Sequence, residues 1–272
     1  MVMRNKSHTL IPLATLGNIG KVALAATALN LQLCSHALAQ ESSSPGAVST
    51  LVDWMPFILK GFSLNLAMSL LAMIIATILG VILGLMQISE FAPIRWIAKF
   101  VTQVFRNSPW LVILFVVMLL VPFRLEVPGI GLLGLPDWTK ATFAFSLPVM
   151  ANISEIVRGA IASIPRGQWD SAESLAFTRL QSLRYVILPQ CVKRSIPPWM
   201  NWYAILTLAT PMASILGVEE AVNNAQAAMN AAGSKPEYLV PFYLFVMALF
   251  FLYIYPIALW TRKLEKTFAV RI

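Results

Sequence analysis

Residues 57–86 read FILKGFSLNLAMSLLAMIIATILGVILGLM, and Lys60 is the only charged residue among them. A helix that crosses a bilayer needs about 20 consecutive, mainly apolar residues. A helix on the surface of a soluble core would instead show a polar face at every turn. The stretch therefore predicts a transmembrane helix, and its excess length predicts that the helix is tilted or extends beyond the hydrocarbon.

Further apolar stretches follow along the chain. They cover residues 101–122, 141–157, 196–218 and 239–260. Pro109 lies near the start of the first of these four, and Pro211 interrupts the third. The 272 residues are 58% hydrophobic and 12% charged, whereas soluble domains are about half apolar and a quarter charged. The sequence predicts an all-α transmembrane fold with five spans.

The loops between these stretches alternate in charge. Three basic segments carry Arg95, Lys99 and Arg106, then Arg158, Arg166, Arg179, Arg184, Lys193 and Arg194, and finally Arg262, Lys263, Lys266 and Arg271. The two intervening segments carry Glu126 and Asp137, then Glu219, Glu220 and Glu237. Basic loops stay in the cytoplasm. We therefore expect a multi-pass protein of a bacterial inner membrane, with a periplasmic mature N-terminus and a cytoplasmic C-terminus.

The first 40 residues have the pattern of a secretory signal. Arg4, Lys6 and Lys21 precede a short apolar core at 22–33, and Ala37-Leu38-Ala39 follows as a small-x-small cleavage pattern. The core is shorter than a spanning helix, which favours a cleavable signal peptide over 1–39. An uncleaved additional transmembrane helix is the alternative.

This gives the expected domain organisation. It consists of the signal peptide at 1–39, a periplasmic linker at 40–56, a transmembrane domain at 57–262 with a long loop at 159–195, and a cytoplasmic tail at 263–272.

Composition excludes several functional classes. Both histidines and Cys34 lie in the predicted signal peptide, so the mature chain keeps only Cys191. Such a chain has no zinc site and no Cys–His nucleophile pair, and we expect neither a metal nor an enzyme activity. The net charge of +8 sits in short loops without an extended basic face, which argues against nucleic-acid binding.

Residues 155–190, EIVRGAIASIPRGQWDSAESLAFTRLQSLRYVILPQ, form a patterned cytoplasmic loop. Pro165 and Gly167 break the chain before a short helix predicted at 168–177, with Ala172, Leu175 and Ala176 on one side. A turn at 177–178 precedes a second amphipathic helix at 180–188, which we expect to end at Pro189. Two short helices parallel to the membrane indicate a docking surface.

These residues resemble the EAA loop of ABC importer permeases, in which coupling helices fit into a cleft of the ATPase subunit. The resemblance rests on Asp170-Ser171-Ala172-x-x-Leu175-Ala176 with Leu188-Pro189-Gln190. Further segments are similar to the polar amino acid branch in particular. They are Glu155–Gly159, Ile164–Trp169, Phe105–Pro109 and Pro197-Pro198-x-x-Asn201.

The resemblance implies a five-helix importer permease core with two short coupling helices. The residues it assigns to ATPase coupling are Asp170, Ser171, Ala172, Glu173, Leu175, Ala176, Leu188 and Pro189. It implies four kinds of partner: a cytoplasmic ATPase dimer, a second permease copy or paralogue, a periplasmic solute-binding protein and the bilayer. The chain has no GxxxxGK[ST] motif, so ATP and Mg are expected on the ATPase and no cofactor on this chain.

The chain departs from the family pattern at three places. Asp170 replaces the usual glutamate, which keeps the charge on a shorter arm. Ala176 replaces the usual glycine, so we expect the turn after the first coupling helix to shift by a residue, because alanine disfavours positive φ. Residues 208–212 read LATPM where the family often has Lys-Asp-Thr-Ser-Leu, which removes a charged pair from the fourth span.

Five residues are candidates for the substrate path, and most have a structural alternative. They are Asn152, Glu155, Thr210, Met212 and Ser214. Glu155 either lines the path or pairs with Arg158 three residues on, and Asn152 either faces the path or donates a hydrogen bond to another helix. Thr210 and Ser214 flank Pro211, where the helix either opens for substrate or is only kinked.

The predicted function is that of the transmembrane permease of an ATP-driven, binding-protein-dependent importer for polar amino acids. A permease of the same family for an opine or a compatible solute is the nearest alternative. An ion-coupled secondary transporter is a second one, but it predicts an inverted repeat and paired intramembrane charges, and we find neither in the sequence.

Overall fold

The computed structural model describes residues 46–122, 124–127 and 131–268. The chain divides into residues 1–50 and a compact unit of residues 51–272, and the architecture below is that of the second unit. The predicted signal peptide at 1–39 and the first part of the predicted linker lie outside the described residues.

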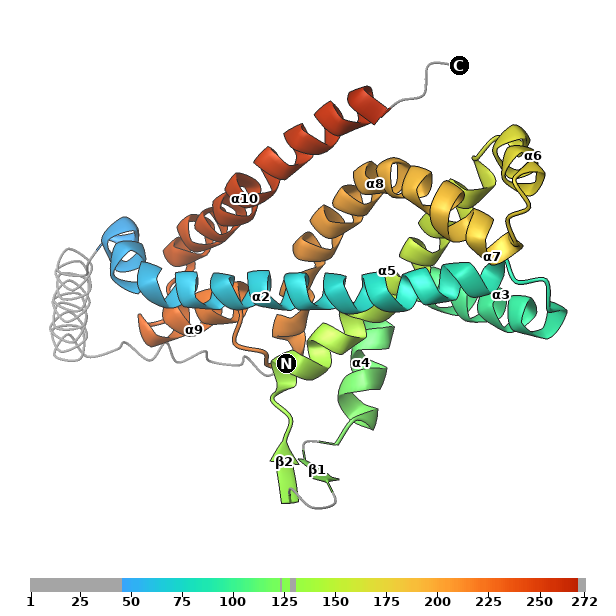
Figure 1. Cartoon of the computed structure of the whole chain (residues 1–272). Helices are drawn as coiled ribbons and strands as arrows, with labels where there is room; N and C mark the ends of the chain where they lie inside the picture. The colour runs from blue at the N-terminus through green and yellow to red at the C-terminus, as the bar shows by residue number, and fades with distance from the viewer. Residues whose placement is uncertain (1–45, 123, 128–130, 269–272) are drawn as a thin grey trace, which may run out of the picture. The chain divides into compact units, whose positions relative to one another are not determined.

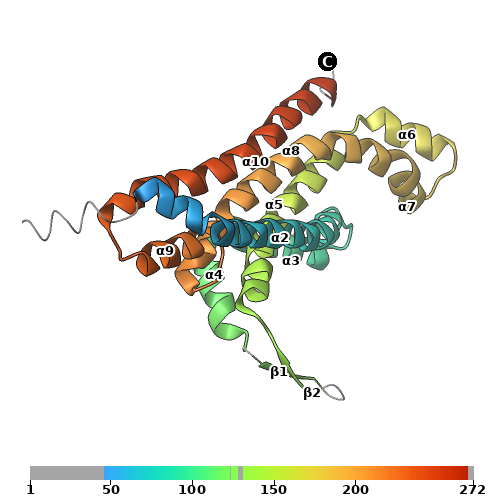
Figure 2. The ribbon, with the colours of Figure 1, turned by 90° about the vertical axis from the view of Figure 1, so that its left-hand side faces the viewer.

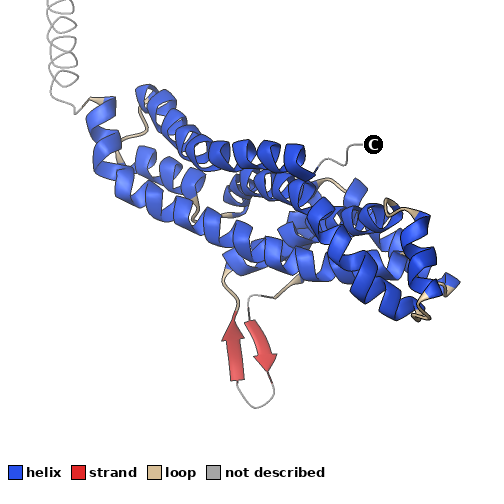
Figure 3. Cartoon of the chain, turned by 45° about the horizontal axis from the view of Figure 1, so that its top comes forward, coloured by secondary structure: helices blue, strands red, loops and turns tan. Residues whose placement is uncertain are grey.

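Helices dominate the described chain. In chain order the elements are α2 (Ala47–Gln87), α3 (Ala92–Asn107), α4 (Trp110–Leu120), β1 (Arg124–Val127), β2 (Gly131–Gly134), α5 (Asp137–Ala162), α6 (Arg166–Ser174), α7 (Arg179–Gln181), the π-helix η1 (Ser182–Ile187), α8 (Leu188–Ala209), the 3₁₀-helix η2 (Thr210–Leu216), α9 (Ala221–Ala231), the 3₁₀-helix η3 (Pro236–Tyr238) and α10 (Leu239–Phe268). The predicted helical fold is confirmed. A two-stranded antiparallel hairpin, with Arg124 opposite Gly134, adds to it and projects from the helices between α4 and α5 (Figure 3).

Two described helices extend beyond the predicted spans. Helix α2 begins at Ala47, so residues 47–56 of the predicted linker are helical. The segment before Pro56 contains neither glycine nor proline, and nothing in it interrupts the helix. At the other end of the chain α10 continues to Phe268 and takes up part of the predicted tail.

The second predicted span is not one helix. Helices α3 and α4 meet at an angle of 106°. The break falls at Ser108 and Pro109, both with extended backbone angles, because proline disfavours helical geometry in the residue before it. Helix α3 is strongly amphipathic, whereas the eleven residues of α4 are apolar all round.

The second helix of the coupling loop, predicted at 180–188, also differs from the prediction. It does not end at Pro189, because the π-helix η1 runs directly into α8. The N–H of Leu188 donates to the carbonyl of Leu183, five residues back. In an α-helix the ring of Pro189 would clash with the carbonyl four residues back, and the wider π turn moves that carbonyl aside.

Within the described residues, two helices are by themselves long and apolar enough to cross a membrane, Ala47–Gln87 and Pro236–Thr267. Three further candidates are pairs of helices bent at a short break, namely α3 with α4, α5 with α6, and the segment Arg179–Leu216 with α9. Counting each bent pair as one span gives up to five in the described residues, which matches the number predicted.

The main core lies between α2, α4, α5 and α8, and α10 runs along α8 (Figures 1 and 2). Helices α2 and α5 approach closely through Gly80 and Gly84, a small-x-x-x-small pair. A Cβ added at Gly80 would lie 2.7 Å from the Cβ of Ile153, and one at Gly84 would lie 2.8 Å from the carbonyl oxygen of Ser154. Small residues at such a spacing let two helix backbones meet.

The unit has two distinct ends. At one end the turn after α2 meets the coupling loop through an ion pair between Glu90 and Arg179. At the other end α9 meets the first part of α2, where Asn224 Nδ2 donates to the carbonyl of Phe57 over 2.9 Å. Figures 1 and 2 show α6 and α7 far from α9. These are called the coupling end and the α9 end.

Candidate functional site

The coupling loop folds as a helical hairpin whose acidic face is open. Helix α6 begins after Pro165, whose extended backbone starts the helix, and it presents Asp170, Ser171 and Glu173 outward. Ala172 is buried. Leu175, predicted on the same side of the helix as Ala172, is 70% exposed and forms part of the open surface.

The turn after α6 does not shift, contrary to expectation. Ala176 itself adopts the left-handed conformation, with a φ of 58°. The N–H of Phe177 donates to the carbonyl of Ala172 and the N–H of Ala176 donates to that of Glu173, the two bonds of a Schellman motif. The loop therefore holds Ala176 in a backbone conformation that glycine adopts more easily than alanine.

The second half of the loop carries exposed apolar side chains. Thr178 starts α7 with a capping box to Gln181, and Leu180 and Tyr185 are then 73% and 62% exposed. We call Asp170, Glu173, Leu175, Leu180 and Tyr185 the coupling surface. Exposed apolar side chains beside acidic ones are typical of a surface that docks against another protein.

Specific contacts tie this loop to the transmembrane helices. Arg194 on α8 donates to the carbonyl of Ser163 at the end of α5 over 2.7 Å, and Gln190 donates to Gln168 on α6 over 3.0 Å. Ile187 is fully buried in a small apolar cluster of its own. Of the other two predicted coupling residues, Leu188 packs against this cluster and Pro189 is exposed. The loop is braced on both α5 and α8.

The structure separates the five candidate path residues. Glu155 lies towards the coupling end and binds Arg158, whose Nη2 is 2.8 Å from Oε2, so the predicted pairing is present. Arg106 approaches the same carboxylate at 3.8 Å. Asn152 donates to the carbonyl of Pro148 on its own helix. The hydrogen bond to another helix, one of its two predicted alternatives, is therefore not the bond that this amide group makes.

The other three candidates lie in or around η2. The helix gives way to 3₁₀ geometry at Thr210 and ends at Gly217 with a φ of 80°, so the predicted interruption at Pro211 is confirmed. Thr210 is fully buried and Ser214 donates to the carbonyl of Pro211. Met212 packs against the main core.

A cavity of about 590 Å³ opens at the coupling end beside Glu155 and Arg158. Next to it, Gln87 donates to Thr102 and to Ser154 over 3.0 and 3.1 Å, which links α2, α3 and α5 through buried polar groups. Sequence reasoning missed this cluster, because its members come from three separate stretches.

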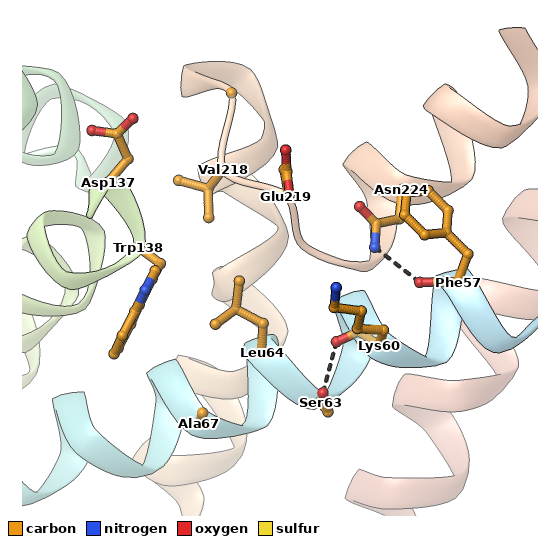
Figure 4. A pocket seen from close by; sticks show the side chains of 11 residues that line it. Phe57, Lys60, Ser63, Leu64, Ala67, Asp137, Trp138, Val218, Glu219 and Asn224 are labelled. Carbon is orange, nitrogen blue, oxygen red and sulfur yellow. Dashed lines mark hydrogen bonds between the residues drawn. The ribbon is translucent and has the colours of Figure 1, made fainter. Parts of the chain in front are cut away.

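A second cavity, of about 470 Å³, opens at the α9 end. Its walls come from α2, the start of α5 and the loop between η2 and α9 (Figure 4). Lys60, Asp137 and Glu219 bring charge to it, and Phe57, Leu64, Trp138 and Val218 bring apolar surface. None of the five predicted path residues lines it. We call it the outer pocket.

Residues 76–266 match the family described as "Binding-protein-dependent transport system inner membrane component". The chain belongs to this family. Its predicted membership among importer permeases is confirmed.

Individual relatives agree. The probable amino-acid ABC transporter permease protein YckA of Bacillus subtilis is 33% identical over 176 residues, 64% of this chain and 74% of YckA. The glutamate/aspartate import permease protein GltK of Escherichia coli is 32% identical over 199 residues, 71% of this chain and 86% of GltK. A crystal structure of an amino acid ABC transporter with histidines has the same fold, with a TM-score of 0.66 at 23% identity over 81% of this chain and 99% of that one.

Sequence reasoning placed Glu220 in an acidic loop and did not foresee that it is buried. Glu220 is fully buried and follows Glu219 of the outer pocket, and it caps α9 by accepting from the N–H of Asn223 at 2.9 Å. Asn65 on α2 donates to both Glu220 and Thr210 over 2.9 Å. The signal was a carboxylate directly before an alanine-rich helix, although glutamate is not among the usual capping residues.

Proposed function

We propose that this chain is the transmembrane permease subunit of an ATP-driven, binding-protein-dependent importer for polar amino acids, with the ATPase activity on a separate polypeptide. The observation that carries the proposal is the coupling surface. It combines exposed acidic and apolar side chains, including Asp170 and Leu175, on a hairpin braced against two transmembrane helices.

The coupling end faces the cytoplasm in this proposal. It holds residues of two of the three basic segments, such as Arg106 and Arg179, which favours retention inside. The acidic residues lie in β1, at the start of α5, after η2 and in η3. The chain then lies in the bacterial inner membrane with its mature N-terminus in the periplasm and its C-terminus in the cytoplasm.

The partners follow from the family. A periplasmic solute-binding protein delivers the solute at the α9 end, and a second permease copy or a paralogue completes the path. A dimer of ATPases binds at the coupling surface, and ATP and Mg belong to it. The bilayer surrounds the apolar residues that α2 and α10 expose, such as Ile74, Ile78, Met247 and Phe251.

The mechanism that these contacts support is mechanical. When the ATPases close on ATP, they displace α6 and the start of α8 together, because Gln168 and Gln190 join these two helices. The displacement reaches α5 through Ser163 and Arg194. Tilting of α5 and α8 then opens the path at one end and closes it at the other, as coupled helices shift between two packings.

The substrate class rests on relatives. YckA is named as a probable amino-acid permease and GltK as a glutamate/aspartate permease. The predicted fourth span, which forms α8 and η2, lacks the Lys–Asp pair that the family often carries. Residues 208–212, which include Thr210 and Met212, occupy that place in the sequence. An opine or a compatible solute is the alternative substrate class.

The test is uptake by proteoliposomes that contain this chain, its companion ATPase and its binding protein. We expect ATP-dependent uptake of at least one polar amino acid from a radiolabelled panel. Asp170→Arg should assemble in the membrane yet lose about tenfold or more of uptake and of substrate-stimulated ATP hydrolysis, because it reverses a charge at the docking face. Glu265→Arg, a charge reversal at an exposed residue near the end of α10 and outside the coupling surface, is the matched control and should keep uptake.

Two outcomes would contradict the proposal. Equal uptake by Asp170→Arg and wild type would remove the coupling role of the loop. Wild-type uptake that runs on an ion gradient without ATP would make the chain a secondary transporter.

A further inference from the structure

The outer pocket carries two opposite charges without ion-pair partners among the described residues. Lys60 reaches from α2 toward the loop that carries Glu219, and both side chains are exposed to the cavity (Figure 4). Asp137, the third charged residue of the lining, forms an ion pair with Lys140 at 2.8 Å. The pocket therefore offers one cationic and one anionic group that an incoming ligand can neutralise.

The pocket wall also contains a side-chain amide oxygen that accepts no hydrogen bond from the described residues. Asn224 is only 3% exposed, and its Nδ2 donates to the carbonyl of Phe57 over 2.9 Å. Its Oδ1 accepts no hydrogen bond from any described residue. A buried amide oxygen without a donor destabilises the fold, so a ligand that brings an N–H group to this wall gains a bond that the empty pocket lacks.

The size and the remaining walls suit a small solute. The cavity measures about 470 Å³, within the usual range for small-molecule sites. Leu64, Trp138 and Val218 supply apolar surface beside the charges. Helix α2 packs closely against the loop before α9, because a Cβ added at Gly61 would lie 2.6 Å from the carbonyl carbon of Glu220. This close packing keeps the pocket narrow.

We propose that the outer pocket binds the zwitterionic head group of an α-amino acid, with Lys60 holding its carboxylate and with Glu219 and Asn224 Oδ1 accepting from its ammonium group. This inference rests on the proposed import of amino acids and adds an entry site to it. The pocket binds the head group that all α-amino acids share. It therefore selects the class of solute, and other contacts select among the side chains.

The test measures occupancy without transport. The full chain, reconstituted with its ATPase, carries Ser63→Cys in a background in which Cys34 and Cys191 are serine. The rate of labelling by an impermeant maleimide is measured with each proteinogenic amino acid, its methyl ester and its N-acetyl derivative. We expect at least one free amino acid to slow labelling, and both blocked derivatives of it to fail. Ala67→Cys, on the same wall, is the second reporter in case the first disturbs the pocket.

Charge variants identify the groups involved. Lys60→Gln and Glu219→Gln should each raise the amino acid concentration for half-protection by about tenfold, the usual effect of losing one charge-assisted bond. Lys235→Gln and Glu237→Gln are matched controls, because this exposed pair lies at the same end but outside the outer pocket. Their half-protection concentrations should stay unchanged.

The outcomes separate the two proposals. Protection as expected, with no ATP-driven uptake, would overturn the proposed function and keep the pocket. Uptake without protection at either reporter, protection by the blocked derivatives, or equal effects of the control variants would overturn the pocket assignment and keep the importer.

Discussion

Ala176 shows how a single residue can carry strain that the surrounding loop imposes. Its φ of 58° lies in the left-handed region, where the Cβ of an L-residue crowds the following carbonyl oxygen. The hydrogen bonds of Ala176 and Phe177 back to α6 hold the turn in place. The sequence departure from glycine was visible, but its outcome was not, because local preference and loop bonding act in opposite directions.

Ala176→Gly should therefore stabilise the coupling loop by about 1 kcal/mol, since glycine enters this region without steric cost. Hydrogen exchange at the amides of residues 171–178 measures the effect, and we expect it to slow by about fivefold. Ala172→Gly is the matched control, because Ala172 lies inside α6 and glycine weakens a helix interior. Exchange that is unchanged or faster in Ala176→Gly would contradict the strain.

Buried polar residues mark the limit of sequence reasoning at this scale. Asp170 and Glu173 were assigned to a docking surface because a local motif surrounds them, and both are exposed. Glu220 and Gln87 were missed, because their partners lie at distant positions in the chain. Hydrogen bonds between separate helices leave no periodic trace in the sequence.

At the scale of elements, apolar runs located the helices and prolines located most of their breaks. The helix is interrupted at Pro211 as predicted, and the 3₁₀ segment begins one residue earlier, at Thr210. Pro109 was seen but the 106° bend was not, because proline fixes only the backbone near it and packing sets the angle between the helices. Pro189 does not end its helix, since a π segment precedes it, and the pattern of side chains gives no sign of that segment.

The close contact between α2 and α5 gives an element-scale prediction. Gly84→Ala should lower the melting temperature of the purified permease, by the equivalent of about 1–3 kcal/mol, because the new Cβ meets the carbonyl oxygen of Ser154 at 2.8 Å. Gly159→Ala on α5 is the control. Nothing lies within 4 Å of its added Cβ, so helix propensity alone should leave stability equal or higher.

A melting temperature of Gly84→Ala that equals or exceeds that of Gly159→Ala would show that α2 and α5 are not held at this distance. Both variants are measured in the same detergent, so that its effect on the melting temperature is the same for each.

At the scale of the whole molecule, loop charge grouped two segments that lie together and separated them from an acidic segment at the other end. The turn after α2 and the start of α7 were both assigned to the cytoplasm from their basic residues, and Glu90 and Arg179 do meet. The acidic segment before α9 was assigned to the opposite side, and α9 packs against the first part of α2. Which helices touch within the bundle depends on side-chain packing, and loop charge does not specify it.

The direction of the two ends in the membrane is the final prediction. Ser171 lies on α6 and Ser234 lies just after α9, and both are exposed. In a background with Cys34 and Cys191 changed to serine, Ser234→Cys should react with an impermeant maleimide in intact spheroplasts, because loops poor in lysine and arginine face outward. Ser171→Cys should react only after permeabilisation, in cells that lack the partner ATPase. The opposite pattern would invert the permease and move the coupling surface away from any cytoplasmic ATPase.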